Sequence, residues 1–229
     1  MEIYCLPGTM CDHRLWGFTQ KALGRFATLH HIVLPMEDTL ESMVDALAKI
    51  LPDKPIGLLG FSMGGYLASR FAVKYPERIN RLMVLSNTAT GLLNSERKQR
   101  EVALNWVSTQ GYRGIPRKKA MAMLGAHNQS NEVLVRLIQD MDKALGEPVL
   151  VQQLKSSLDR PDVLSNLDKV RFPVCFALGQ EDGLVSKEAI DQIKNTAGIE
   201  VRMAACGHML PLEQPDWLAN LITEFYSAD

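Results

Sequence analysis

The strongest constraint on the fold is a serine flanked by glycines directly after an apolar run. Residues 58–66 read LLGFSMGGY. The apolar run predicts a buried strand at 56–61, and a helical pattern follows over 65–75. A G-x-S-x-G sequence between a strand and a helix is typical of a strained turn that exposes the serine hydroxyl. Ser62 is therefore predicted to be a nucleophile, and the alternative is a small residue in a glycine-rich turn.

Short apolar runs alternate with longer amphipathic stretches along most of the chain. Runs that begin and end at Gly, Pro, Asn or charged residues predict strands, and periodicity near 3.6 residues predicts helices. Alternation of the two is typical of βαβ units, so we expect an α/β fold with a doubly wound, mostly parallel sheet of about six strands. The expected strands are 3–6, 31–34, 56–61, 82–86, 174–178 and 200–204, and the expected helices are 40–51, 65–75, 187–196 and 215–226.

The middle of the chain interrupts this alternation. Residues 91–167 contain no predicted strand, but helical patterns occur at 96–110, 116–124, 131–145 and 148–158. We interpret 91–167 as a helical cap insertion over the carboxyl edge of the sheet, with 1–90 and 168–229 forming the core. Three methionines in it either line an adaptable apolar pocket or pack between helices, and the second reading is favoured: Met121, Met123 and Met141.

A serine nucleophile needs a base, and His208 is the best candidate. It follows the last predicted strand, in a loop at the carboxyl edge where open α/β sheets bind ligands. In hydrolases with this serine motif, the histidine follows the acid and the last strand in the chain. The other four histidines are interpreted as packing or surface residues: His13, His30, His31 and His127.

The acid that orients the histidine is expected between Ser62 and His208, after another strand. The predicted strand 174–178 leads into Gly-Gln-Glu-Asp-Gly at 179–183. Asp182 is the preferred acid, and Glu181 is the close alternative. The Asp182 carboxylate would fix the imidazole tautomer and stabilise the imidazolium ion.

Acyl transfer also needs hydrogen-bond donors aimed at the oxyanion. The amide of Met63, directly after the serine, is one expected donor. The second is expected from the loop after the first strand, where Gly8 permits a close approach and Thr9 offers its amide. Met10 belongs to the same candidate oxyanion and substrate-binding loop. An ordinary turn is the alternative, because Pro-Gly is a common turn signal.

Charge and cysteine usage narrow the class of partner. The 229 residues carry 25 Lys+Arg and 26 Asp+Glu, a net charge of −1, so no overall field favours nucleic acid or an anionic membrane. Neither a signal peptide nor an apolar run of about 18 residues is found, and we expect a cytoplasmic protein. The four cysteines lack CxxC spacing, so neither a disulfide scaffold nor a metal site is predicted. Cys11 and Cys206, near the expected site, are interpreted as small buried hydrophobic residues rather than nucleophiles.

Four segments together resemble the α/β-hydrolase superfamily, most closely its compact esterase-like branch with a helical cap. They are LPGTMCDHRLW at 6–16, GFSMGGYLASRFAVKYPERINRLMVLSN at 60–87, FPVCFALGQEDGLVS at 172–186 and CGHMLPLEQPDWLANLITEF at 206–225. The resemblance implies the strand order 2-1-3-4-5-6, without the N-terminal hairpin of larger members. Pro7 stands where this branch usually has histidine, and Met10 where a second glycine is common.

The resemblance implies a serine hydrolase that cleaves a carboxylic ester or thioester of a small to medium apolar acyl group through Ser62, His208 and Asp182. No cofactor or metal is expected, and the partner is a small-molecule substrate of a monomer or homodimer. Two alternatives remain: a lyase, as in menaquinone synthesis, or carbon–carbon bond hydrolase on the same fold, and a non-catalytic ligand receptor. Four basic residues of 91–167 either bind a polyanionic substrate or form a solvated helix face: Arg97, Arg100, Arg113 and Arg117.

Overall fold

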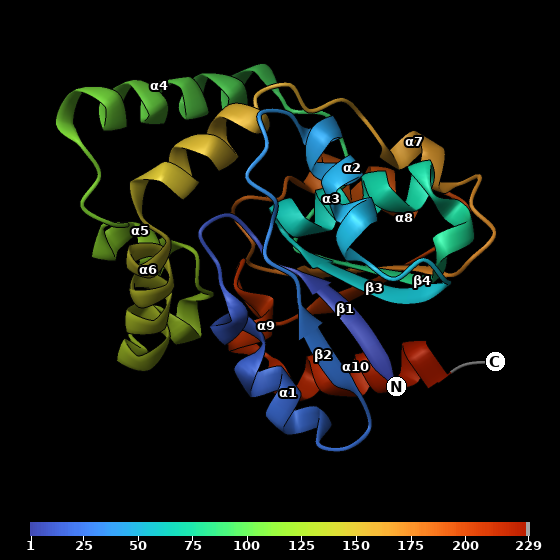
Figure 1. Ribbon diagram of the computed structural model, residues 1–229. Helices are drawn as coiled ribbons and strands as arrows, with labels where there is room; N and C mark the ends of the chain where they lie inside the picture. The colour runs from blue at the N-terminus through green and yellow to red at the C-terminus, as the bar shows by residue number, and fades with distance from the viewer. Residues whose placement is uncertain (228–229) are drawn as a thin grey trace.

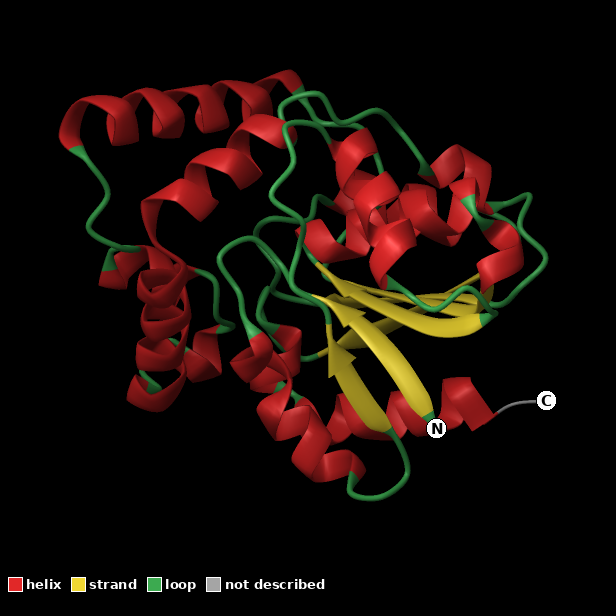
Figure 2. Ribbon diagram, viewed as in Figure 1, coloured by secondary structure: helices red, strands yellow, loops and turns green. Residues whose placement is uncertain are grey.

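The computed structural model describes residues 1–227 and places a six-stranded parallel sheet at the centre of the molecule (Figures 1 and 2). Its order, β2-β1-β3-β4-β5-β6, confirms the predicted order. The strands are β1 (Glu2–Leu6), β2 (Thr28–His31), β3 (Ile56–Phe61), β4 (Ile79–Leu85), β5 (Val174–Gly179) and β6 (Ile199–Ala204). Every residue of β3 and β5 is buried, as expected of central strands covered on both faces.

The second strand lies earlier in the chain than predicted. The apolar pattern placed it at 31–34, whereas β2 spans Thr28–His31 and pairs with β1 from Glu2 opposite Thr28 to Cys5 opposite His31. It is an edge strand whose residues are exposed or only half-buried. Such a strand needs no continuous apolar run. The apolar run at 31–34 lies mostly beyond the strand, and its Val33 is 70% exposed. The predicted position was wrong because an apolar pattern does not show where an edge strand that is partly exposed to solvent begins and ends.

Helices cover both faces of the sheet and bury two separate apolar cores (Figures 1 and 2). The sheet lies between these two cores. Successive side chains of a strand point to opposite faces, so in β3 Leu59 belongs to the first core and Leu58 to the second. The first face carries α1 (Gly17–Leu23) and α10 (Pro215–Ser227), and the second carries α2 (Leu40–Ile50), α3 (Met63–Lys74), α7 (Leu164–Leu167) and α8 (Lys187–Lys194).

Several short helices have no counterpart among the predicted elements. Helix α1 has seven residues, and only Thr19 and Leu23 are buried. Two buried positions are too few to produce a recognisable helical periodicity in the sequence. The others are shorter than α1: α7, α9 (Leu210–Glu213) and the 3₁₀ turns η1 (His13–Trp16), η2 (Pro76–Arg78) and η3 (Ala126–Asn128).

Between β4 and β5 the chain forms α4 (Asn94–Gln110), α5 (Arg117–Ala122) and α6 (Glu132–Ser156). These helices lie together beside the carboxyl edge of the sheet (Figure 1). Gly146, with φ of 74°, interrupts α6 where two helices were predicted. Met141 is fully buried in the first core, against which Met121 and Met123 pack. No described helix is long and apolar enough to cross a membrane.

Candidate active site

Ser62 occupies the turn between β3 and α3 in a conformation that few L-residues adopt. Its φ is 51° and its ψ is −117°, and its amide donates to the Leu85 carbonyl oxygen at 2.8 Å. The flanking glycines are required by close backbone packing. A Cβ on Gly60 would lie 2.3 Å from the Gly64 carbonyl oxygen, and one on Gly64 would lie 2.2 Å from that of Leu6. The turn therefore holds Ser62 under strain, a conformation that clusters at functional sites.

Three side chains from separate loops form a continuous hydrogen-bonded series. The Nε2 atom of His208 lies 3.0 Å from the Ser62 Oγ, and its Nδ1 atom lies 2.8 Å from the Asp182 Oδ2. His208 and Asp182 are only 5% and 6% exposed. The other Asp182 oxygen, Oδ1, accepts from the Leu184 amide at 2.9 Å, which fixes the carboxylate. With the Nδ1 proton donated to Asp182, the Nε2 lone pair faces the serine hydroxyl and can accept its proton.

The His208 loop is held firmly by its neighbours. The His208 amide donates to the Met123 carbonyl oxygen at 2.8 Å. A Cβ on Gly179, at the end of β5, would lie 2.1 Å from the Gly207 carbonyl oxygen. The Phe61 ring lies 5.2 Å from the imidazole, centroid to centroid. Contacts with β3, β5 and the segment after α5 therefore limit the movement of the imidazole.

The alternative acid, Glu181, points elsewhere. Its Oε2 accepts from the Ala126 amide at 2.8 Å, so it contacts the segment between β4 and β5 rather than His208.

The other four histidines lie away from Ser62 and Asp182. His30 bonds to Glu2, His13 and His31 have ring centroids 6.2 Å apart, and His127 is exposed in η3.

The loop after β1 passes close to Ser62. A Cβ on Gly8 would lie 2.8 Å from the Phe61 ring and 3.1 Å from the Ser62 Cβ. Thr9 lines the same pocket as Ser62 and Met63, and its hydroxyl contacts the Met63 sulfur at 3.6 Å. Met63 is the first residue of α3, and a helix leaves its first amides without intrahelical partners. The amides of Thr9 and Met63 thus belong to the segments that flank the serine.

Met10 differs from the other loop candidates. It has a φ of 56°, and its amide donates to the Oε1 atom of Gln153 at 3.0 Å. The Met10 amide is therefore not an available oxyanion donor, and it ties the loop to α6 instead. Gln153 is only 4% exposed. Gln153 could not be identified from the sequence, because a glutamine within an amphipathic helix carries no local signal of burial.

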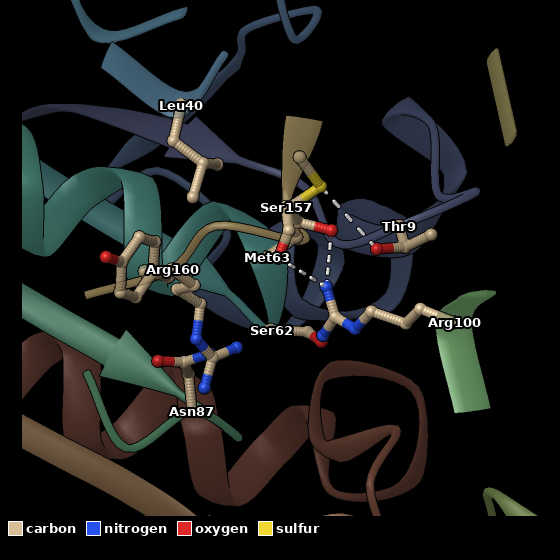
Figure 3. Close-up of a pocket in the computed structure, with 9 residues that line it drawn as sticks. Thr9, Leu40, Ser62, Met63, Asn87, Arg100, Ser157 and Arg160 are labelled. Atoms are coloured by element: carbon tan, nitrogen blue, oxygen red, sulfur yellow. Dashed lines mark hydrogen bonds between the residues drawn. The ribbon is translucent and has the colours of Figure 1, made fainter. Parts of the chain in front are cut away.

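A cavity of about 40 Å³ adjoins the serine (Figure 3). Its walls are mostly polar and include two arginines, although the substrate expected from the sequence has an apolar acyl group. None of the three methionines singled out in the sequence lines it. The lining residues are Thr9, Leu40, Ser62, Met63, Tyr66, Asn87, Arg100, Ser157 and Arg160.

The four arginines of the insertion have different surroundings. Arg97 pairs with Glu101 and Arg117 with Glu132, and Arg113 is exposed. Arg100 alone among the four lines the pocket. The second arginine of the pocket, Arg160, was not identified from the sequence.

The cysteines near the site are buried thiols. Burial raises the pKa of Cys11 to about 12 and also raises that of Cys206. A thiolate is therefore disfavoured at both positions. Within residues 1–227, no three or more His, Cys, Asp or Glu side chains form a cluster able to hold a metal ion.

Comparison with known proteins identifies the family. Residues 9–213, about nine-tenths of the chain, match the family described as serine aminopeptidase, S33. The chain belongs to this family. Membership makes the protein an α/β-fold serine hydrolase and confirms the α/β-hydrolase resemblance.

The hydrolase is similar in structure to a thermophilic esterase from Thermogutta terrifontis, with a TM-score of 0.84 and 21% identity over 99% of this chain and 89% of that chain. It is also similar to the enol-lactonase from Burkholderia xenovorans LB400, with a TM-score of 0.85 and 15% identity over 99% of this chain and 91% of that one. These likenesses show the fold.

A curated relative of the hydrolase is the pimeloyl-[acyl-carrier protein] methyl ester esterase of Salmonella heidelberg (strain SL476). The two are 34% identical over 95 residues, which are 38% of this chain and 37% of the relative. The hydrolase thus matches little more than a third of that relative's length.

Proposed function

We propose that the hydrolase cleaves a carboxylic ester or thioester through an acyl-enzyme, with Ser62 as nucleophile, His208 as general base and Asp182 as the orienting acid. The observation that supports this most is the hydrogen-bonded series from Ser62 to His208 at 3.0 Å and from His208 to Asp182 at 2.8 Å. The base lies within the reach that proton transfer needs, and a third group orients it.

In the proposed first half-reaction, the Ser62 oxygen attacks the substrate carbonyl carbon as its proton passes to His208 Nε2. The amides of Met63 and Thr9 donate to the resulting oxyanion, and each such donor typically contributes a 10²–10³-fold rate increase. The imidazolium, stabilised by the Asp182 carboxylate, then protonates the leaving alcohol or thiol. Water attacks the acyl-enzyme with His208 again as base, which regenerates the serine.

We further propose that residues 91–167 act as a cap. Two observations support this role. The segment between β4 and β5 contributes Gln153, which holds the loop after β1, and Arg100 and Ser157 in the pocket wall. It also contacts the His208 loop through the Met123 carbonyl oxygen. Such a cap would exclude bulk water, and a drier site strengthens electrostatic interactions.

A fluorophosphonate probe that phosphonylates activated serines tests the nucleophile. We expect the wild type to be labelled, Ser62→Ala to be unlabelled, and His208→Ala to react at least about 10²-fold more slowly, because general-base activation is lost. Ser157→Ala is the matched control, since this serine lines the same pocket and its hydroxyl donates to the Gln153 carbonyl oxygen at 2.7 Å; it should be labelled like the wild type. Equal labelling of the wild type and Ser62→Ala would contradict the proposal.

Turnover separates an esterase from a ligand receptor built on the same frame. The enzyme is expected to release p-nitrophenol from p-nitrophenyl esters in proportion to the fraction of Ser62 left unlabelled. Release that continues unchanged after complete labelling would contradict the assignment of Ser62.

A further inference from the structure

Two arginine side chains from different segments reach the pocket that contains Ser62 (Figure 3). Arg100 comes from α4, and its guanidinium donates to the carbonyl oxygen and the hydroxyl of Ser157. Arg160 follows α6; its Nε donates to the Thr90 carbonyl oxygen at 3.1 Å, and its guanidinium lies 4.9 Å from the Tyr66 ring centroid. Neutral groups therefore position both cations.

Neither cation has a carboxylate partner among the described residues. The ion pairs of other arginines show the contrast: Arg70 with Glu41, Arg97 with Glu101, Arg117 with Glu132 and Arg202 with Glu224. Both side chains are half-buried, and a cation that loses part of its hydration is ordinarily paired with a carboxylate. Ion pairing within the fold therefore does not explain why Arg100 and Arg160 lie in this pocket.

The surroundings of the pair favour an added anion. Burial lowers the pKa of both guanidinium groups, and the charge of Arg160 lowers that of Arg100 further. Glu96 opposes this effect on both, but its carboxylate accepts from the Leu93 amide at 3.1 Å. An anion between the two guanidinium groups would relieve their repulsion and replace the lost hydration.

Asn87 completes the polar wall. Its Oδ1 accepts from the Ala89 amide at 2.7 Å, so its amino group is the end left to donate into the pocket. The cavity is small, about 40 Å³ where one water molecule needs roughly 10–15 Å³, so it suits the carboxylate end of a short acyl chain.

We propose that Arg100 and Arg160 bind a carboxylate at the far end of the acyl group, so that the preferred substrates are esters or thioesters of short dicarboxylic acids. This inference rests on the proposed function, since it places the carbonyl at Ser62, and it replaces the expected apolar acyl group with an anionic one. The arginines are specificity-determining residues in this scheme, and they take no part in the bond-making steps.

Kinetics with two p-nitrophenyl esters of similar length test the proposal: the mono-ester of succinate, which is anionic, and the butyrate ester, which is neutral. We expect kcat/KM of the wild type to favour the succinate ester by at least about 10-fold. Arg100→Gln and Arg160→Gln should each lower kcat/KM for the succinate ester by about 10–100-fold, the range typical of a lost charge-assisted hydrogen bond. The kcat/KM for the butyrate ester should fall by a smaller factor than that for the succinate ester, so the preference for the succinate ester should fall in both variants.

Two further variants separate specificity from folding. Arg97→Gln, on the same helix but paired with Glu101, should leave the preference unchanged. Arg100→Lys retains the charge and should recover part of the succinate preference. No preference in the wild type, or an equal loss of both activities in the Gln variants, would overturn the proposal.

Binding without turnover distinguishes this proposal from the proposed function. Calorimetry with glutarate, a dicarboxylate that cannot be hydrolysed, should detect binding to Ser62→Ala and at least a 10-fold weaker affinity after Arg160→Gln is added. Glutarate binding that depends on Arg160, without any ester turnover, would uphold the anion site while refuting the esterase. Ester turnover without glutarate binding and without succinate preference would refute the anion site alone.

Discussion

At the scale of single residues, the loop after β5 shows how neighbouring carboxylates acquire different roles. Glu181 accepts from the Ala126 amide, whereas Asp182 accepts from His208. The sequence predicted an acid in this loop, and it kept both residues as candidates. The choice depends on the backbone turn, in which the Glu181 amide donates to the Cys206 carbonyl oxygen and the Asp182 amide to that of Gly179. The contacts of Glu181 with Cys206 and Ala126 join segments far apart in the chain, and no local sequence signal specifies them.

The two acids are expected to respond very differently to neutralisation. Asp182→Asn should lower kcat for a p-nitrophenyl ester by about 10⁴-fold, because an amide cannot hold the productive imidazole tautomer or stabilise the imidazolium. Glu181→Gln is the matched control and should stay within about threefold of the wild type. Steady-state kinetics at saturating ester measure both. A larger loss in Glu181→Gln than in Asp182→Asn would reverse the assignment.

At the scale of elements, the loop after β1 and helix α6 form one unit. The sequence predicted that Gly8 lets this loop approach the serine, and the close contacts of Gly8 with Phe61 and Ser62 agree with it. The anchor was not predicted: the bond from the Met10 amide to Gln153 joins residues 143 positions apart. Periodicity finds a helix, but it does not reveal which polar residue of that helix is buried against a distant loop.

Loss of the Gln153 amide should affect both stability and catalysis. Gln153→Ala leaves the Met10 N–H buried without an acceptor, which costs about 1–3 kcal/mol. It also frees the loop that carries the Thr9 amide, so kcat should fall by about 10–100-fold. The upper end of this range approaches the effect of removing one oxyanion donor. Chemical denaturation and ester kinetics measure the two effects.

Gln152→Ala serves as the control for this prediction. Gln152 neighbours Gln153 in α6, but its side-chain amide donates to the Glu37 carbonyl oxygen, in the segment between β2 and α2. Its kcat should stay near that of the wild type. An unchanged kcat in Gln153→Ala, or an equal fall in both variants, would show that this anchor does not position the oxyanion loop.

At the scale of the whole molecule, the sheet brings distant residues together. Ser62 and His208 are 146 positions apart and their side chains meet at one edge, because parallel strands place their carboxyl ends on the same side. This property of parallel sheets allowed Ser62, Asp182 and His208 to be proposed from the sequence, whereas the strand order was implied by the family resemblance. The sequence did not predict that Arg100 and Arg160 line one pocket, because α4 and the segment after α6 meet only through tertiary packing. The position of β2 was also missed, since an edge strand has a weak apolar pattern.

The central claim is that Ser62 and His208 act as one catalytic unit. The most direct test is kcat for a p-nitrophenyl ester in the wild type, Ser62→Ala, His208→Ala and the double variant, with unfolding measurements to show that all four fold. Residues that act as a unit are strongly non-additive. Each single change is expected to lower kcat by about 10⁶-fold, and the double variant is expected to lose no more than about threefold beyond either. Multiplicative losses, or a single variant that retains near-wild-type kcat, would contradict it.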